Sequence, residues 1–158
     1  MAYVEMENYF FSNITGRKYL SLFSNPDFDT DTWQALFHLP LDKLVNTYST
    51  GMKKKLAIVG ALKLDKDILI LNEAFNGQDI ESNQILKLVL QRLCEQGKTI
   101  IVTSHVVEIM LDVCNYIHYL TAGAIYKTYP VNDFIELKIE ILSAIEKNAS
   151  DMLNKAFL

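Results

Sequence analysis

Ile68-Leu69-Ile70-Leu71-Asn72-Glu73 is a run of four apolar residues that stops abruptly at two polar ones. An uninterrupted apolar run this short is typical of a strand that is buried on both faces in a parallel sheet. A helical pattern follows over residues 80–95 and ends before Gly97, and Thr99-Ile100-Ile101-Val102-Thr103 forms a second apolar run. The order strand, helix, strand predicts a right-handed parallel crossover and therefore an α/β fold.

The sequence before this unit has mostly helical spacing. Thr15 is a candidate N-cap for a first helix, and the acidic, proline-containing stretch 25–31 interrupts the pattern. Either Ser49 or Thr50 caps a later helix, which we expect to end near Leu64. This part of the chain is therefore expected to form a helical subdomain.

Two further elements are expected after the unit. Residues 116–120 and 124–129 flank a short loop that contains a glycine, which predicts an antiparallel hairpin at the edge of the sheet. Residues 131–158 have helical spacing and are expected to pack or to make contacts. We therefore expect one domain over residues 1–158, with a helical subdomain at about 9–64, a core at about 65–130 and a helical tail at 131–158.

The composition is that of a folded, globular protein. Of 158 residues, 50% are hydrophobic and 22% are charged, which excludes a disordered or low-complexity chain. The net charge of -4 has the wrong sign for neutralising nucleic-acid phosphates, so no nucleic-acid partner is expected. Cys94 and Cys114 have neither disulfide-motif nor metal-ligand spacing, which favours a reduced, intracellular environment. No apolar run approaches the ~18 to 20 residues that cross a bilayer, so we expect any membrane connection to run through a partner.

Polar residues follow both apolar runs, where ligands bind in open α/β sheets. Glu73 comes directly after the first run and His105 shortly after the second, so both could reach one ligand. Taken singly, Glu73 is more typical of a turn or a helix cap, and His105 of a helix start. A third place is the segment from Ser49 to Lys53, where a hydroxyl, a glycine and a lysine gather at a helix N-terminus suited to an anion.

Three blocks together resemble the motifs of ABC-type ATPases. Tyr48-Ser49-Thr50-Gly51-Met52-Lys53-Lys54-Lys55-Leu56 is similar to that family's signature motif. Residues 67–79 resemble its Walker B strand, catalytic glutamate and D-loop, and Thr103-Ser104-His105 resembles its switch histidine. The resemblance extends from about Tyr3 to about Tyr129 and implies a partial P-loop NTPase domain of the ABC ATPase type.

The resemblance implies a role for each matched residue. Glu73 would polarise the water that attacks the γ-phosphate of ATP, and His105 would contact that phosphate. Ser49 and the backbone N–H of Gly51 would bind the γ-phosphate of a nucleotide held by a second ATP-binding subunit, because two such domains sandwich two ATP molecules head to tail. Asp79 would lie in the seam between the subunits.

The resemblance also implies partners and a location. Subunits of this family power a transmembrane permease from the cytoplasmic side, so a peripheral position at the inner face of the membrane is expected. The region that would touch the permease contains Tyr9, Phe10, Phe11 and residues 13–18, although an aromatic cluster is also typical of an ordinary core. Lys53 is expected to help attract phosphate, whereas the next two lysines, Lys54 and Lys55, are expected on a solvated helix face.

Three departures from the family pattern bear on catalysis. Asn72 stands where the family has the Walker B aspartate, which weakens the expected binding of Mg²⁺. No glutamine stands at the Q-loop position, so Glu7 is left to sense the γ-phosphate, or no residue does. The sequence also contains no GxxxxGK[ST] block to cradle phosphates, and the expected explanation is that the first part of the domain has been lost.

Three functions are compatible with these observations. The first is a truncated ATP-binding subunit of an ABC transporter that is not active alone. The alternative is a non-catalytic remnant that binds or regulates a full ATPase subunit or a membrane partner; Asn72 favours it, and the presence of both Glu73 and His105 argues against it. A DNA-repair or translation ATPase of the same superfamily is disfavoured by the acidic charge balance.

Overall fold

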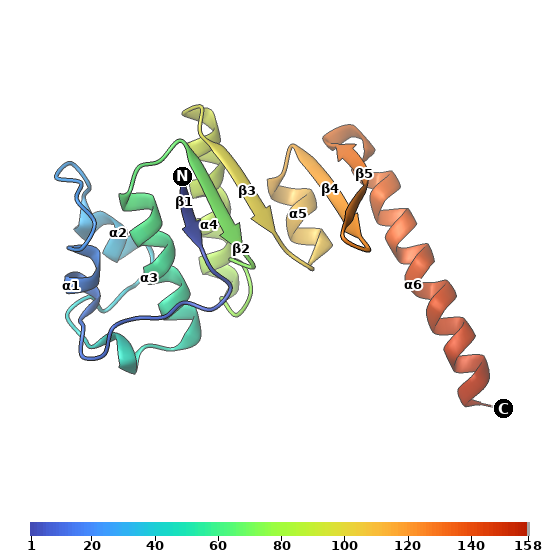
Figure 1. Cartoon of the computed structure of the whole chain (residues 1–158), viewed down its shortest axis with the longest axis horizontal. Coiled ribbons are helices and arrows are strands. Elements are labelled where there is room, and N and C mark those ends of the chain that lie inside the picture. The colour runs from blue at the N-terminus through green and yellow to red at the C-terminus, as the bar shows by residue number, and fades with distance from the viewer. Residues whose placement is uncertain (158) are drawn as a thin grey trace. The chain divides into compact units, whose positions relative to one another are not determined.

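A computed structural model describes residues 1–157, apart from the side chains of residues 147, 148, 151 and 155. The chain forms two compact units, Met1–His105 and Val106–Leu158 (Figure 1). Each unit is described separately below. The boundary between the two units, after His105, falls inside the segment expected at about 65–130. The expected division into a helical subdomain, a core and a tail stays a prediction.

The first unit contains a three-stranded parallel sheet with the order β1-β2-β3. Its strands are β1 (Ala2–Val4), β2 (Ile68–Asn72) and β3 (Thr99–Thr103). Its helices are α1 (Gly16–Leu20), α2 (Thr30–Leu36), α3 (Thr50–Lys63) and α4 (Ile80–Glu95), with a short 3₁₀ turn at Val45–Thr47. The strand, helix, strand unit and the α/β fold class are therefore confirmed.

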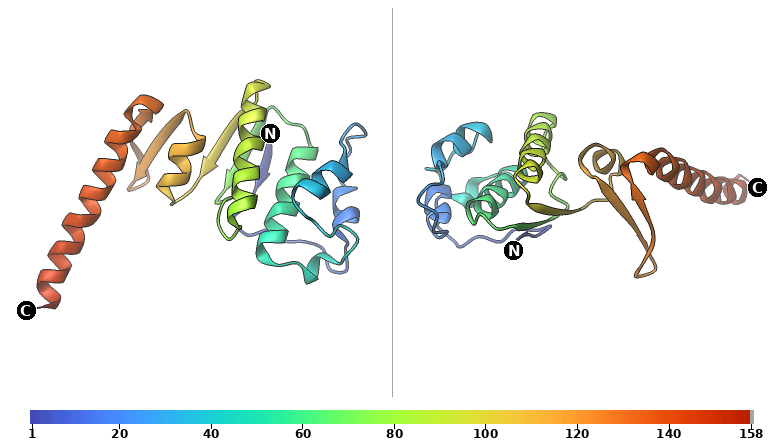
Figure 2. Two further views of the ribbon diagram at one scale, coloured as in Figure 1. Left: turned by 180° about the vertical axis from the view of Figure 1, so that it is seen from behind. Right: turned by 90° about the horizontal axis from the view of Figure 1, so that it is seen from above.

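The strand register separates the residues of the sheet into two faces. Leu71 pairs with Val4 on one side and Val102 on the other, and this row is covered because α3 and α4 lie on one face of the sheet (Figure 2). The opposite row contains Tyr3, Ile70 and Ile101, and Ile101 is 48% exposed. The expectation that both strands are buried on both faces is wrong, because the helices of this unit cover one face only.

Side-chain caps fix where the helices begin. The hydroxyl oxygen of Thr15 accepts from the N–H of Lys18, and that of Ser49 accepts from the N–H of Met52. Ser49 is thus the cap of α3 and Thr50 its first residue, and the helix ends at Lys63 with Leu64 as its C-cap, near the expected end. Beneath these helices lies an apolar cluster formed by Ile14, Leu20, Phe37, Leu39, Leu41, Val45, Tyr48, Leu56 and Val59.

The second unit is built around an antiparallel hairpin. It contains α5 (Val107–Val113), β4 (Tyr116–Thr121), β5 (Ala124–Pro130), a 3₁₀ turn at Val131–Asp133 and α6 (Phe134–Ala156). The expected antiparallel hairpin is confirmed. Its expected place at the edge of the parallel sheet is wrong, because among the described strands β4 and β5 pair only with each other. Tyr129, Phe134 and Leu137 form the buried cluster that joins the hairpin to α6. Among the helices described, none is both long enough and apolar enough to span a membrane.

The exposed row of the sheet predicts self-association, because an apolar strand face and unpaired strand edges favour contacts between copies. We expect Ile101→Thr to reduce concentration-dependent association in analytical ultracentrifugation. The free energy of unfolding should stay within about 0.5 kcal/mol of the original, since the side chain is half exposed.

Leu71→Ala is the matched control on the covered face, where the side chain is fully buried. It should lower the free energy of unfolding by about 2–5 kcal/mol without reducing association. If the original chain and Ile101→Thr associate equally, the row that contains Ile101 does not make the contact between copies.

Candidate functional site

Glu73 lies directly after β2, in a conformation that few residues adopt. Its φ is +51°, in the left-handed region that disfavours residues with a side chain. Its N–H donates a 3.0 Å hydrogen bond to the carbonyl of Thr103 at the end of β3. This bond holds the backbone turn against the neighbouring strand and sets where the carboxylate can point.

The Glu73 carboxylate contacts two side chains. Its Oε2 accepts a 2.8 Å hydrogen bond from Asn76 Nδ2 and lies 3.2 Å from His105 Nδ1. The Glu73 side chain is 16% exposed, whereas the His105 ring is 72% exposed. The structure thus brings together the two residues that follow the two strands, with a covered carboxylate and an imidazole open to solvent.

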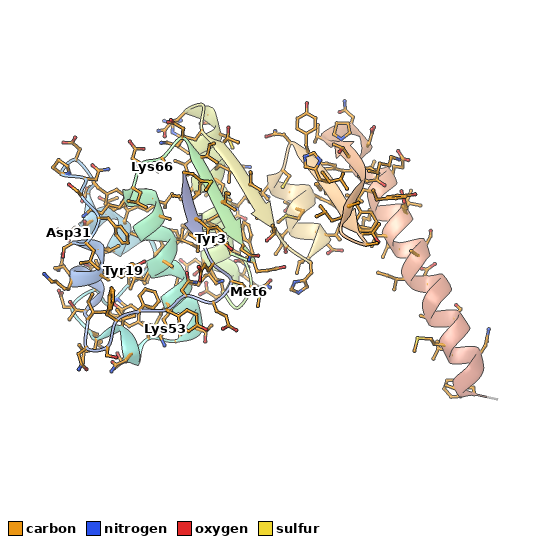
Figure 3. All side chains as sticks on the ribbon, in the orientation of Figure 1. Tyr3, Met6, Tyr19, Asp31, Lys53 and Lys66 are labelled. Carbon is orange, nitrogen blue, oxygen red and sulfur yellow. The ribbon has the colours of Figure 1, made fainter. Side chains whose placement is uncertain are left out.

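Asn72 belongs to a second polar group, on the uncovered face of the sheet. Its Oδ1 accepts a 2.7 Å hydrogen bond from the Thr103 hydroxyl, and its Nδ2 donates to the hydroxyl of Tyr3 at 3.3 Å. Tyr3 is labelled on β1 in Figure 3. Both polar atoms of the Asn72 amide are therefore engaged by neighbouring strands.

These donors do not fit Mg²⁺. This ion prefers carboxylates and water, and Asn72 offers one neutral oxygen that already holds a hydroxyl. Within the described part of the chain, no three acidic, histidine or cysteine residues are grouped to hold a metal ion. The described side chains at this edge thus pair a carboxylate with an imidazole and offer no such group of metal ligands.

Gly51 and Gly77 bring the start of α3 against the loop that follows Glu73. A Cβ at Gly51 would lie 2.9 Å from the carbonyl oxygen of Gly77, which is closer than such atoms approach in proteins. Gly51 therefore has to lack a side chain for the two segments to meet. Ser49, beside it, is exposed and uses its oxygen to cap α3, with 3.2 Å to the N–H of Met52.

Asp79 lies in the same loop and caps α4. Its carboxylate accepts from the N–H and the hydroxyl of Ser82 at 2.8 and 2.9 Å. The backbone hydrogen bond from Ser82 lowers the pKa of Asp79, and the hydroxyl adds to the effect. Lys55 Nζ reaches the same pair, 3.1 Å from Ser82 Oγ and 3.7 Å from Asp79. This network joins α3 to the N-terminus of α4.

The expectation that Lys54 and Lys55 lie on a solvated face is wrong, since both are buried. The ammonium of Lys54 donates to the main-chain carbonyls of Glu5 and Met6. The reason lies in the helix around them, because every residue from Lys54 to Ala61 is buried. The sequence of α3 has apolar residues on all sides of the helix, and this pattern is the signal that could have predicted burial of both lysines.

Glu7 is not joined to the Glu73 group. Its carboxylate accepts a 3.3 Å hydrogen bond from the hydroxyl of Tyr9, and both residues are exposed. Sequence reasoning also missed Asn76 and Thr103, which position Glu73 and Asn72. Only Asn76 could have been found from the sequence, because it follows Glu73 by three residues in a turn. Thr103 is 31 residues from Asn72 along the chain.

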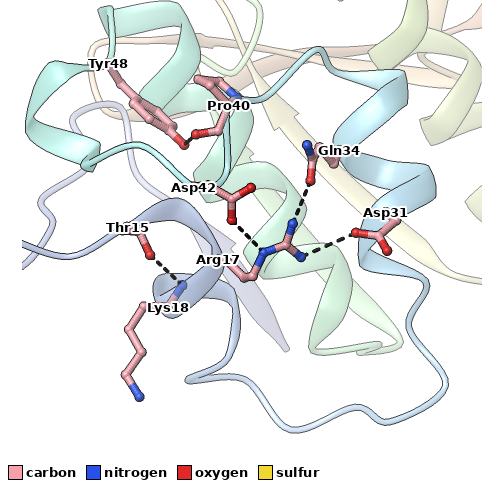
Figure 4. Close-up of polar contacts among 8 residues, drawn as sticks. All are labelled: Thr15, Arg17, Lys18, Asp31, Gln34, Pro40, Asp42 and Tyr48. Carbon is pink, nitrogen blue, oxygen red and sulfur yellow. Dashed lines mark hydrogen bonds and ion pairs between the residues drawn. The ribbon is translucent and has the colours of Figure 1, made fainter.

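A shallow hollow of about 420 Å³ lies elsewhere, beside Arg17, Asp31, Gln34 and His38. The Arg17 guanidinium donates to Asp42 at 2.9 Å, to Gln34 at 3.2 Å and to Asp31 at 3.3 Å (Figure 4). The hydrogen bond from Arg17 also lowers the pKa of Asp42. Because these groups satisfy one another, we interpret the hollow as a structural junction between α1 and α2.

The chain is similar in sequence to ABC transporter ATP-binding proteins, although no family model matches it. It is 39% identical over 83 residues to a putative ABC transporter ATP-binding protein of Listeria monocytogenes, covering 52% of this chain and 31% of that protein. It is 27% identical over 143 residues to the putative ABC transporter ATP-binding protein AlbC of Bacillus subtilis, covering 85% and 60%. The chain therefore spans from about a third to three fifths of the length of these relatives.

Solved structures show the same fold. The structure of an ATP binding subunit of an ABC transporter matches with a TM-score of 0.76 and 21% identity, over 84% of this chain and 59% of that one. A dimeric ATP-binding cassette bound to ADP and Pi, in a post-hydrolysis state, matches with a TM-score of 0.66 and 18% identity, over 82% and 62%. The curated homologues are thus ABC transporter ATP-binding proteins, and the fold is that of ABC ATPase domains.

The close approach of Gly51 to Gly77 yields a direct test. We expect Gly51→Ala to lower the free energy of unfolding by about 1–3 kcal/mol, because the added methyl pushes the two segments apart. Amide chemical shifts of Gly77 and Asp79 should change in the same variant. Thr50→Ala, at the exposed neighbouring position, is the control and should leave the Gly77 amide in place. An unshifted Gly77 in Gly51→Ala would contradict the contact.

Proposed function

We propose that this chain is part of an ATP-binding subunit of an ABC transporter and that Glu73 and His105 act on the γ-phosphate of ATP. The contact between Glu73 and His105, 3.2 Å at the carboxyl edge of the sheet, carries the proposal. The homologues and the ABC ATPase fold support it, because the similar proteins are ATP-binding subunits of ABC transporters.

Glu73 is suited to act on the attacking water. Its carboxylate is largely covered and is held in one orientation by the hydrogen bond from Asn76. In this orientation it can accept a hydrogen bond from a water and polarise that water in line with the phosphate. His105 stands beside it with most of its ring exposed and can donate to a phosphate oxygen. The imidazole would then hold the phosphate while the carboxylate aligns the water.

Ser49 and Gly51 are suited to a second nucleotide, held by the opposite subunit. The first N–H groups of a helix lack intrahelical partners and attract anions. The Ser49 hydroxyl accepts from Met52 and can still donate its own hydrogen to a phosphate, because one hydroxyl does both. We therefore propose a head-to-tail pair of subunits with Asp79 in the seam. The dimeric state of the related ADP-bound cassette supports this pairing.

We expect this chain's own side chains to contribute little to the binding of Mg²⁺. Asn72 supplies a neutral amide oxygen that already binds Thr103, and Glu7 bonds to Tyr9 rather than to the Glu73 group. The proposed chemistry uses Glu73, His105 and the N-terminus of α3.

The proposed membrane partner is a transmembrane permease, and the proposed location is the cytoplasmic face of the membrane. Tyr9 and Phe11 are 84% and 74% exposed, and such aromatic side chains are suited to docking. Phe10, between them, packs edge-on against Tyr19 with ring centroids 4.9 Å apart. Phe10 thus anchors residues 9–11, and the rings of Tyr9 and Phe11 stay exposed to a partner.

The test of the proposed function requires the phosphate-binding segment that these 158 residues lack. The 158-residue chain alone should show no ATP hydrolysis above buffer, since no GxxxxGK[ST] loop holds the phosphates. A chimaera in which such a segment from an ABC ATPase precedes Met1 should hydrolyse ATP. Glu73→Gln in this chimaera should lower kcat by about 100-fold or more while ATP binding is retained.

Glu95→Gln, an exposed carboxylate at the end of α4, is the matched control and should leave kcat unchanged. A folded chimaera that binds ATP without turnover would favour a non-catalytic module instead. Equal kcat in Glu73→Gln and the parent chimaera would exclude Glu73 as the group that acts on the water.

Asn72→Asp in the same chimaera should increase Mg²⁺-dependent turnover. The substitution replaces a neutral oxygen by a carboxylate at the end of β2, which is the ligand that Mg²⁺ prefers. A titration of turnover against Mg²⁺ measures the effect, and Gln84→Glu, at an exposed position of α4, is the control. An unchanged titration curve would show that residue 72 does not lie at the metal.

A further inference from the structure

Helix α6 continues well past the hairpin that holds its first turns. Phe134 and Leu137 are buried in the cluster that joins α6 to β5, and the hydroxyl of Tyr129 donates a hydrogen bond to Glu140. From Leu142 to Ala156, in contrast, every side chain that the structure describes is exposed, and Figure 1 shows this part of α6 beyond β5. A helical segment of this length is marginal in water unless it packs against another surface. The exposed part of α6 therefore needs a surface to cover it.

The exposed apolar side chains of α6 form one stripe along the helix. They recur every three or four residues, at Ile135, Ile139, Leu142, Ile145, Ala149 and Met152. This spacing is that of the seam between two helices in a coiled coil. The opposite side of the helix carries polar residues such as Ser143 and Ser150, so the stripe is the side suited to an apolar contact.

Two charged residues interrupt the stripe at positions that are symmetric about Leu142. Lys138 lies four residues before Leu142 and Glu146 four residues after it, and both are exposed. The residues three and four positions away from Lys138 are all apolar, and those around Glu146 are uncharged, so α6 itself supplies neither with an ion-pair partner. A cation and an anion placed evenly about Leu142 match a second α6 that runs in the opposite direction.

We propose that the stripe of α6 is the contact surface for a second copy of this chain, with the two helices antiparallel and Leu142 at the two-fold axis. In this register Lys138 of each copy lies level with Glu146 of the other, which gives two ion pairs. Ile139 of each copy lies level with Ile145 of the other, which extends the apolar contact on both sides of the axis. A parallel pair places lysine beside lysine and glutamate beside glutamate, which is repulsive. The contact uses no nucleotide and is independent of the function proposed above.

A membrane surface suits the stripe less well than a second helix does. Helices that lie on membranes are rich in Lys and Arg on the polar side, and these residues attract anionic lipids. Residues 134–156 contain four acidic and three basic residues, so α6 has no such excess of basic residues. The charges of α6 therefore favour a second copy of the same helix over a lipid surface.

Isotope-filtered NOESY on an equimolar mixture of ¹³C-labelled and unlabelled chain tests the register, because it reports only contacts between copies. We expect cross-peaks between the methyl groups of Ile139 in one copy and Ile145 in the other. Within one helix these residues are too far apart to give them, since six residues span about 9 Å. Cross-peaks from Ile139 to Ile139 instead would overturn the antiparallel register. An associated sample without cross-peaks from α6 would overturn the contact itself.

Analytical ultracentrifugation of variants tests the apolar part of the contact. Each variant is made in the Ile101→Thr chain, so that the uncovered row of the sheet contributes little. Leu142→Gln should weaken self-association by about tenfold or more, because a residue at the axis is used twice. Ser143→Gln, on the polar side of α6, is the matched control and should leave self-association unchanged. Both positions are exposed, so both variants are expected to fold.

A charge exchange tests the ion pairs in the same chain. Lys138→Glu should weaken self-association by about threefold or more, because two contacts between glutamates replace the two ion pairs. The double variant Lys138→Glu with Glu146→Lys restores both pairs and should return the dissociation constant to within about twofold of the parent. A double variant as weak as Lys138→Glu would overturn the register, since the exchange restores nothing in a parallel pair. A monomeric parent, whose α6 resonances shift only with vesicles of phosphatidylcholine and phosphatidylglycerol, would overturn the second copy as the occupant.

Discussion

The parallel pairing of β2 with β3 is the constraint on which the candidate site depends. Asn72 pairs with Thr103 in register, so both strands end at one edge of the sheet. The N–H of Glu73 then bonds to the Thr103 carbonyl, and this bond turns the chain into the left-handed conformation of Glu73. A shift of one residue would reverse the faces and separate Glu73 from His105.

A second constraint is the burial of α3 on all sides. Apolar residues supply most of its contacts, but its first turns are held by polar ones: Lys54 to the segment after β1, Lys55 to Ser82 and Asp79, and Gly51 against Gly77. The segment after β1, the loop at Gly77 and the start of α4 therefore all contact the first turns of α3.

The sequence predicted the elements well where local rules decide. The apolar runs located β2 and β3, residues 80–95 gave α4, and the capping residues Thr15 and Ser49 were recognisable from their hydroxyls. Strand order alone predicted that Glu73 and His105 lie at one edge of the sheet, within reach of one ligand. The exposure of Ile101 was not predictable in the same way, because it depends on which elements pack over the sheet. The burial of Lys54 and Lys55 was missed although the apolar residues on all sides of α3 gave a signal for it. The motifs shared with ABC ATPases gave roles to Ser49, Gly51 and Asp79, and these roles stay predictions.

The central claim is that the edge formed by Glu73 and His105 acts on the γ-phosphate and its attacking water. A crystal structure of the chimaera with ADP and aluminium fluoride tests it most directly, since the fluoride takes the place of the transferred phosphoryl group. The account predicts a water within about 3.2 Å of the Glu73 carboxylate, in line with the aluminium, and the His105 ring on a fluoride. A fluoride held by other residues, with Glu73 bonded to Asn76 alone, would contradict the account.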